Sequence, residues 1–171
     1  PTVFSKRDLA LRIDPGGGLG HHEKVVTAGS HAKFGHPFGE IDELLDAVEE
    51  LGARVVGLHA HVGSGILQSG AWAPTAELLA GLAERLPDLR WIDIGGGLGV
   101  VERPGQSPLD IAAVEASLTA IRERLGEVTL RMEPGRYLVS EAGVLLAPVT
   151  QVRRKGEVTF VDGAHTGAMP G

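Results

Sequence analysis

The stretch Arg90-Trp91-Ile92-Asp93-Ile94 is followed at once by Gly95-Gly96-Gly97-Leu98-Gly99, the pattern of a short buried strand that ends in a glycine-rich turn. Amphipathic helices are predicted on both sides of it, because apolar residues recur at steps of three and four over 78–86 and over 111–125. A helix before the strand and another after it indicate the repeating unit of a parallel α/β sheet with helices outside it.

The same alternation extends toward both ends of the chain. Further strands are predicted at 11–14, 54–62 and 128–133, and another amphipathic helix at 41–51. The strands begin at intervals of about 40 residues, similar to the repeat of a (β/α)8 barrel, in which about 250 residues make eight units. Four such units amount to half a barrel, so we expect its first and fourth strands to be open edges.

The pattern changes after Val139. Residues 143–152 and 158–162 have the composition of strands joined by a polar turn at 153–157, with no helix between them. We therefore predict two domains, a partial (β/α)8 barrel over 1–142 and the start of a C-terminal β-domain over 143–171.

The composition excludes several classes of function. Sixteen Lys and Arg against 22 Asp and Glu give a net charge of -6, which speaks against nucleic acid as a partner. The absence of cysteine excludes disulfides and thiolate metal sites, and it agrees with a reducing compartment. The chain shows neither a run of 18 apolar residues nor the pattern of a signal peptide, so no membrane span is predicted.

The turn Gly95-Gly96-Gly97-Leu98-Gly99 is a candidate anion site. Glycines at the carboxyl end of a parallel strand let bare N–H groups close on an anion, usually phosphate. The dinucleotide fingerprint is excluded, because the frame from Gly95 reads Gly-x-Gly-x-x-Val and no helix opens at once. A tight turn without a ligand is the alternative. The similar run at 16–20 follows Pro15 in a polar stretch and is predicted to be a loop.

His59 and His61 are separated by one residue on a predicted strand, so both side chains leave the same face. Such a pair binds a metal in some barrel hydrolases, or one imidazole packs flat on an aromatic cofactor. The Ser64 hydroxyl and the glycines beside it suit an anion better than a cation. Buried histidines that bond only to their neighbours are the structural alternative.

The segment Glu133-Pro134-Gly135-Arg136 ends the last predicted barrel strand. Gly135 exposes an N–H, and Arg136 offers a forked donor for phosphate or carboxylate. A carboxylate that points into a barrel mouth needs a cationic partner, and a pyridinium nitrogen is one such partner. A local salt bridge between Glu133 and Arg136 is the alternative. His21, His22 and Glu23 form a polar cluster without a recognisable metal spacing.

Three motifs carry a resemblance to a known family when they are taken together in this order. They are 59–65, 94–99 and 133–136, and they resemble the fold-type III pyridoxal-phosphate decarboxylases of diaminopimelate, ornithine and arginine. The stretch 11–35, which ends in Lys33-Phe34-Gly35, looks most like the diaminopimelate-specific members, in particular those fused to an aspartate kinase. The resemblance implies the second half of an alanine-racemase-like (β/α)8 barrel plus the first strands of a C-terminal β-domain.

The resemblance also implies roles for individual side chains toward pyridoxal 5'-phosphate. His61 is the implied catalytic residue and stacks on the pyridine ring of the cofactor. Glu133 faces the pyridine nitrogen and keeps it protonated, so that the ring accepts electrons when CO2 leaves. Arg136 lies near the phosphate and the substrate carboxylate, and Lys33 is a candidate for an ion pair across a dimer. The residues that hold the cofactor phosphate are Ser64, Gly95, Gly96, Gly97 and Gly135.

The chain departs from the family in what it lacks. The family's Schiff-base lysine, in a Tyr-x-x-Lys-like motif, and its Cys-Glu-x-x-Asp segment have no counterpart here. We therefore expect an internal fragment of an enzyme whose Schiff-base lysine lies outside these residues. The implied reaction is decarboxylation of meso-2,6-diaminopimelate to L-lysine and CO2, in a cytoplasmic homodimer with shared active sites and without metal, membrane or nucleic acid.

Three alternatives to this function remain open at the sequence level. One is a related decarboxylase of ornithine or arginine, and another is a non-catalytic barrel segment that binds pyridoxal phosphate or phosphate. The third is a metal-dependent barrel hydrolase that uses His59 and His61, although further His and Asp ligands are missing at the strand ends.

Overall fold

The computed structural model describes residues 3–16, 33–144, 146 and 148–163. Its contacts divide the chain into two compact units, Pro1–Ser140 and Glu141–Gly171. That 143–171 opens a larger β-domain remains a prediction.

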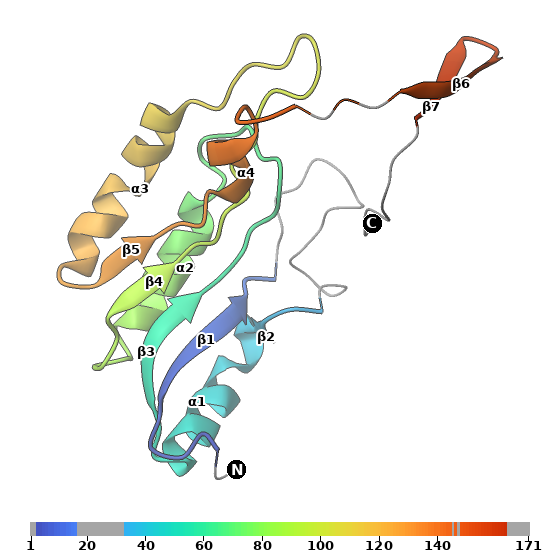
Figure 1. The fold of residues 1–171 in the computed structure, drawn as a ribbon. Coiled ribbons are helices and arrows are strands. Elements are labelled where there is room, and N and C mark those ends of the chain that lie inside the picture. The colour runs from blue at the N-terminus through green and yellow to red at the C-terminus, as the bar shows by residue number, and fades with distance from the viewer. Residues whose placement is uncertain (1–2, 17–32, 145, 147, 164–171) are drawn as a thin grey trace. The chain divides into compact units, whose positions relative to one another are not determined.

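The first unit is built on one parallel sheet, shown in Figure 1. The strand order is β2-β1-β3-β4-β5, and each neighbouring pair is parallel, which confirms the predicted α/β class. The strands are β1 (Asp8–Asp14), β2 (His36–Pro37), β3 (Arg54–His59), β4 (Trp91–Asp93) and β5 (Thr129–Arg131).

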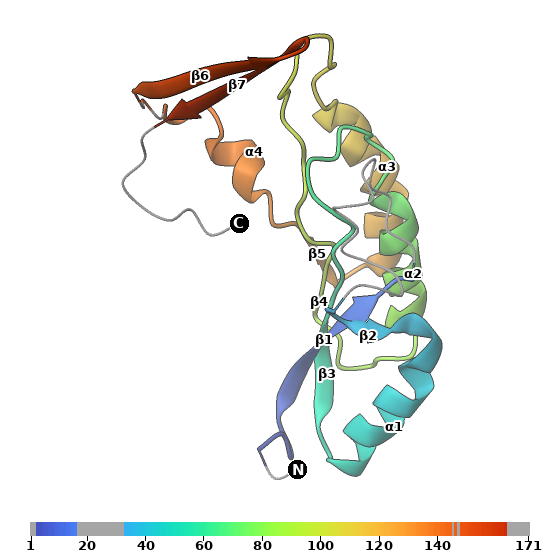
Figure 2. The same ribbon diagram turned by 90° about the vertical axis from the view of Figure 1, so that its right-hand side faces the viewer.

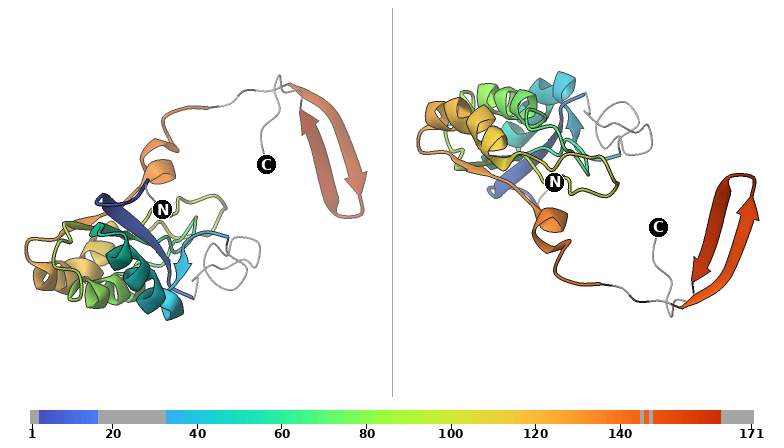
Figure 3. Two further views of the ribbon diagram at one scale, coloured as in Figure 1. Left: turned by 90° about the horizontal axis from the view of Figure 1, so that it is seen from below. Right: turned by 90° about the horizontal axis from the view of Figure 1, so that it is seen from above.

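Three α-helices lie on the same side of this sheet, as Figure 2 shows, and in a row when viewed from either end (Figure 3). They are α1 (Ile41–Glu50), α2 (Ala73–Ala83) and α3 (Ile111–Leu125). They correspond to the three predicted helices, although α2 begins before the predicted 78–86 and ends before its last residues. A 3-10 turn, η1 (Phe38–Glu40), precedes α1, and a short helix, α4 (Gly135–Val139), follows β5. At the start of α3, the Asp110 side chain accepts the N–H of Ala113 at 3.0 Å.

The core of the unit lies between the sheet and these helices. Leu58 and Ile92 occupy the same register position on β3 and β4, and both are completely buried. Leu79 of α2 and Leu118 of α3 belong to the same apolar cluster. Burying each such side chain stabilises the fold by about 1.5–3 kcal/mol. The alternate residues of the strands therefore point to the opposite face, where polar side chains gather.

The short elements β2 and α4 were not predicted, and the expectation that the first strand is an open edge is wrong. β2 pairs with the last residues of β1 at Ile13 and Asp14, so β1 is not an edge along its whole length. β2 has two residues and α4 has five, which is too short for a recognisable period in the sequence.

The second unit contains an antiparallel hairpin of β6 (Val149–Lys155) and β7 (Val158–Gly163). The predicted polar turn at 153–157 is too long, because Lys155 already pairs with Val158 and only two residues connect the strands. Gly156 has a φ of +62°, which suits the first central position of a two-residue hairpin turn. Within the described parts of the chain, no helix is long and apolar enough to cross a membrane.

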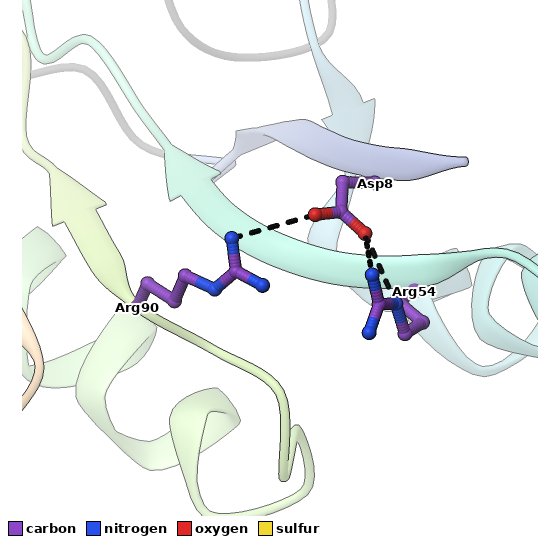
Figure 4. A network of polar contacts seen from close by, with 3 residues as sticks. All are labelled: Asp8, Arg54 and Arg90. Atoms are coloured by element: carbon purple, nitrogen blue, oxygen red, sulfur yellow. Dashed lines mark hydrogen bonds and ion pairs between the residues drawn. The ribbon is translucent and has the colours of Figure 1, made fainter.

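An ionic cluster joins the amino ends of the central strands (Figure 4). The Asp8 carboxylate accepts bonds from Nε and Nη2 of Arg54 at 3.0 and 2.6 Å, and Nη1 of Arg90 lies 3.4 Å from it. All three side chains are more than a third exposed, so water and salt screen them.

Asp8→Asn is expected to lower the free energy of unfolding by at most about 1 kcal/mol, since exposed ion pairs contribute little. Urea unfolding of the intact protein at low and high salt measures this loss, which should shrink at high salt. Asp88→Asn removes a charge from an exposed carboxylate for which the described residues supply no partner, and serves as the control. A loss that persists undiminished at high salt contradicts the prediction.

Candidate functional site

The loops that follow β3, β4 and β5 meet at the carboxyl ends of these strands and enclose an open pocket of about 250 Å³. Parallel strands present their carboxyl ends at one edge of a sheet, which explains why motifs far apart in the sequence meet here. The pocket is lined by His61, Ser64, Gly65, Gly96, Gly97, Leu98, Glu133, Gly135 and Arg136. The structure thus brings together every predicted site residue except Gly95. Gly95 lies close to the His61 ring, since a Cβ on Gly95 would be 2.6 Å from Nδ1 of His61.

The glycines of the turn after β4 allow three loops to approach closely. A Cβ on Gly96 would lie 2.1 Å from the carbonyl oxygen of Glu133, and one on Gly97 would lie 2.0 Å from that of Gly63. Gly97 also has a φ of +89°, a conformation that side chains disfavour. The tight-turn explanation therefore accounts for part of the glycine pattern, and it is compatible with an anion site.

The backbone N–H groups predicted to bind an anion are not equally available. Gly95 donates to Oδ1 of Asp93 at 2.8 Å, Gly96 to Nδ1 of His61 at 3.3 Å, and Gly135 to the carbonyl oxygen of Glu133 at 2.8 Å. An anion would compete with these acceptors. The Gly97 N–H, by contrast, has no acceptor among the described residues and belongs to a residue that lines the pocket.

The His61 ring is neutral in this arrangement. A backbone N–H can only donate, so Nδ1 accepts from Gly96 as an unprotonated atom and the ring proton sits on Nε2. Burial lowers the pKa of His61, and the nearby Arg12 and His59 lower it further, against the opposing influence of Glu133 and Asp93.

His61→Gln is expected to weaken the acid sensitivity of the fold. Because the pKa of His61 is lower in the native state than the ordinary value of about 6.5, the unfolded chain binds more protons as the pH falls below that value. Wild-type stability is therefore fully present above pH 6.5 and declines as the pH falls toward the native pKa. Urea unfolding of the intact protein at pH of about 7.5 and about 5.5 measures the difference. A decline at least as steep in the variant contradicts the prediction.

Glu133 and Arg136 do not form the local salt bridge that the sequence left open. Oε2 of Glu133 lies 3.5 Å from Nε2 of His59, while Nη1 of Arg136 donates to Oε1 of Glu102 at 2.6 Å. The Glu133 side chain is 57% exposed, so its carboxylate is accessible to a cationic group in the pocket.

A row of polar side chains that was not predicted lies on the pocket-side face of the sheet. Arg12, His59, Asp93 and Arg131 are register neighbours across β1, β3, β4 and β5. The ligand atoms of His59, Asp93 and Glu133 lie within 4.8 Å of one another. The predicted strand ends did not reveal this row, because the row depends on the register of the strands.

The two histidines have separate surroundings, contrary to the prediction that they share one strand. β3 ends at His59, and His61 lies two residues beyond it. His59 approaches two carboxylates, whereas His61 bonds to the glycine turn. This arrangement differs from the His59–His61 pair on which the hydrolase alternative depends.

Two further predicted features lie at the boundary of the described residues or outside them. Lys33 and Arg12 each place their charge 4.9 Å from the centre of the Phe34 ring, and the dimer role of Lys33 stays a prediction. The cluster of His21, His22 and Glu23 and most of the glycine run at 16–20 lie outside the described residues.

Comparison with known proteins identifies the family. Residues 2–140 match the model of the pyridoxal-dependent decarboxylases, pyridoxal binding domain. The chain belongs to this family. The match spans most of the chain and confirms the predicted family and its pyridoxal cofactor.

Several proteins similar to this chain are diaminopimelate decarboxylases. That of Methanothermobacter thermautotrophicus is 36% identical over 156 residues, which cover 85% of this chain and 36% of the relative. A crystal structure of diaminopimelate decarboxylase aligns with a TM-score of 0.77 at 32% identity, over 93% of this chain and 39% of that one. The Helicobacter pylori enzyme complexed with L-lysine aligns with a TM-score of 0.76 at 25% identity, over 95% and 41%. The chain therefore spans less than half the length of these proteins.

Proposed function

We propose that this chain forms the cofactor-binding part of a pyridoxal-phosphate enzyme that decarboxylates meso-2,6-diaminopimelate to L-lysine and CO2. The observation that carries the proposal is the convergence of His61, Ser64, Gly97, Glu133 and Arg136 on one pocket. The names of the relatives support the substrate, and the L-lysine complex of the H. pylori enzyme supports the product.

The donors of the pocket fit the phosphate end of pyridoxal phosphate. Ligand pockets for whole organic molecules usually have about 300–1,000 Å³, so the 250 Å³ here suits one end of the cofactor. The Gly97 N–H and the Ser64 hydroxyl supply donors that no described residue accepts, and Arg136 adds a positive charge. These are the groups that anion binding requires.

The remaining residues of the pocket suit the aromatic end. When bound, pyridoxal phosphate supplies an electron sink for the electron pair left behind by CO2. The accessible carboxylate of Glu133 would hold a proton on a pyridine nitrogen, and His59 beside it limits where that carboxylate can turn. His61 presents a neutral ring held by Gly96, which avoids placing a second positive charge beside a pyridinium.

We also propose a cytoplasmic homodimer with shared active sites that acts on a small amino acid. Two-fold dimers are the commonest oligomers, and the family resemblance of the Lys33 segment favours one here.

The test of the proposed function uses the intact protein with added pyridoxal phosphate. We expect cofactor binding, seen in the visible absorption spectrum, and CO2 release from meso-2,6-diaminopimelate but not from ornithine or arginine. Turnover of ornithine or arginine instead would show that the protein is one of the related decarboxylases and would refute the proposed substrate. Cofactor binding without turnover of any of the three would favour a non-catalytic protein.

A further inference from the structure

The indole of Trp72 contacts the glycine turn from inside the core. Trp72 directly precedes α2, its side chain is completely buried, and its Nε1–H donates to the carbonyl oxygen of Gly96 at 2.9 Å. The bond joins residues 24 positions apart and is itself buried.

The carbonyl that Trp72 holds belongs to the same peptide unit as the N–H of Gly97. Because a trans peptide is planar, its C=O and N–H point in opposite directions. Anchoring the carbonyl on the core side therefore turns the Gly97 N–H away from the core. Gly97 lines the pocket, and its N–H has no acceptor among the described residues.

We propose that Trp72 is a positioning residue of the anion site, which sets the peptide plane between Gly96 and Gly97 so that the Gly97 N–H faces a bound phosphate group. The inference rests on the proposed function, since that function puts a phosphate in this pocket. Donation to the carbonyl also polarises the peptide and makes its N–H a stronger donor.

Alternative orientations of this peptide are not blocked by a side chain, since both residues are glycines. Gly97 at a φ of +89° has access to backbone conformations closed to other residues. The bonds of the Gly96 N–H to His61 and of the Gly97 carbonyl to Ile66 fix the flanking peptides, and the bond from Trp72 favours one orientation of the peptide between them. Rotation of the peptide would leave both the indole N–H and the carbonyl buried and unpaired, which is unfavourable.

Trp91 provides a natural comparison within the same chain. Its ring lies against Gly57 and under the guanidinium of Arg131, 4.8 Å from the ring centre, and its N–H has no acceptor among the residues that the structure describes. Comparing a substitution of Trp72 with one of Trp91 thus distinguishes the effect of losing an indole from the effect of losing the bond to Gly96.

The test compares Trp72→Phe with Trp91→Phe in the intact protein, because phenylalanine keeps an aromatic ring and lacks the N–H. We measure dissociation constants for inorganic phosphate, pyridoxal phosphate and pyridoxal, and follow the Gly97 amide by NMR during the phosphate titration. In Trp72→Phe, binding of phosphate and pyridoxal phosphate should weaken about tenfold, the effect of one hydrogen bond to a charged group. Pyridoxal binding should change less than about twofold, and the Gly97 amide should lose its response to phosphate.

A purely structural role for Trp72 predicts a different pattern. Equal weakening of pyridoxal and pyridoxal phosphate, or the same losses in Trp91→Phe, overturns the inference, as does unchanged phosphate affinity in Trp72→Phe. If Trp72→Phe does not fold, benzothienylalanine at position 72 in the Trp91→Phe background keeps the ring volume and replaces only the N–H with sulfur. Failure of that isostere to fold also overturns the inference, because the bond then serves folding.

The two proposals fail separately. A wild-type protein that binds no pyridoxal phosphate refutes the proposed function, whereas the phosphate titration of the Gly97 amide still decides the role of Trp72. A wild-type protein that binds the cofactor, together with a Trp72→Phe variant that binds it equally well, refutes only the role of Trp72.

Discussion

Glu133→Gln is expected to lower kcat of the intact enzyme at least about tenfold while pyridoxal phosphate remains bound, a loss of about 1.4 kcal/mol or more in transition-state stabilisation. The amide keeps the size of the side chain and can still bond to His59, but it cannot hold a proton on a pyridine nitrogen. The cofactor phosphate is bound by other groups of the pocket, so affinity should change less than turnover.

Steady-state CO2 release and cofactor titration of the same samples check this expectation. Glu127→Gln is the matched control, because Glu127 is exposed and precedes β5, at the strand end opposite the pocket. Near-normal turnover in Glu133→Gln would remove Glu133 from the proposed chemistry. Loss of cofactor binding together with turnover would indicate a role in building the pocket instead.

Gly97→Ala is expected to be the most destabilising small substitution in the site, by about 3 kcal/mol or more. The new Cβ would lie 2.0 Å from the carbonyl oxygen of Gly63, a backbone atom that cannot move aside cheaply. The φ of +89° adds backbone strain of about 1–2 kcal/mol. Such a loss is a large part of the 5–15 kcal/mol that typically stabilises a folded protein.

Gly81→Ala is the matched control for this substitution. Gly81 lies within α2, and a Cβ there would meet nothing within 4 Å. Alanine should therefore stabilise the helix by about 0.5–1 kcal/mol. Denaturant unfolding of both intact variants measures the two effects. A loss below about 1 kcal/mol in Gly97→Ala would mean that the loops after β3 and β4 separate easily.

The helices and strands could be predicted because the spacing of apolar residues along a short stretch of sequence indicates them. α3 coincides with the predicted 111–125, since its apolar residues repeat over four turns. β3, β4 and β5 end earlier than predicted at the pocket side, where β4 stops at Asp93 before Gly95 turns with a φ of +73°. An apolar run in the sequence does not distinguish strand from the buried loop that continues it.

The set of residues around the pocket was also determined by the sequence. Once 54–62, 90–94 and 128–133 are parallel neighbours, the residues at and just after their carboxyl ends must meet at one edge of the sheet. His61, the glycine turn and Glu133 stand at those positions, and the structure places them in one pocket.

Only the tertiary structure decided which partner each polar group takes. Arg136 bonds to Glu102 rather than to Glu133, the Gly96 N–H is used by His61, and the Gly96 carbonyl is used by Trp72. Each of these bonds joins residues at least 24 positions apart. Sequence periodicity reports which side of an element is buried, whereas a hydrogen bond needs atoms within about 3 Å in the right direction. That geometry arises only when separate loops pack against one another.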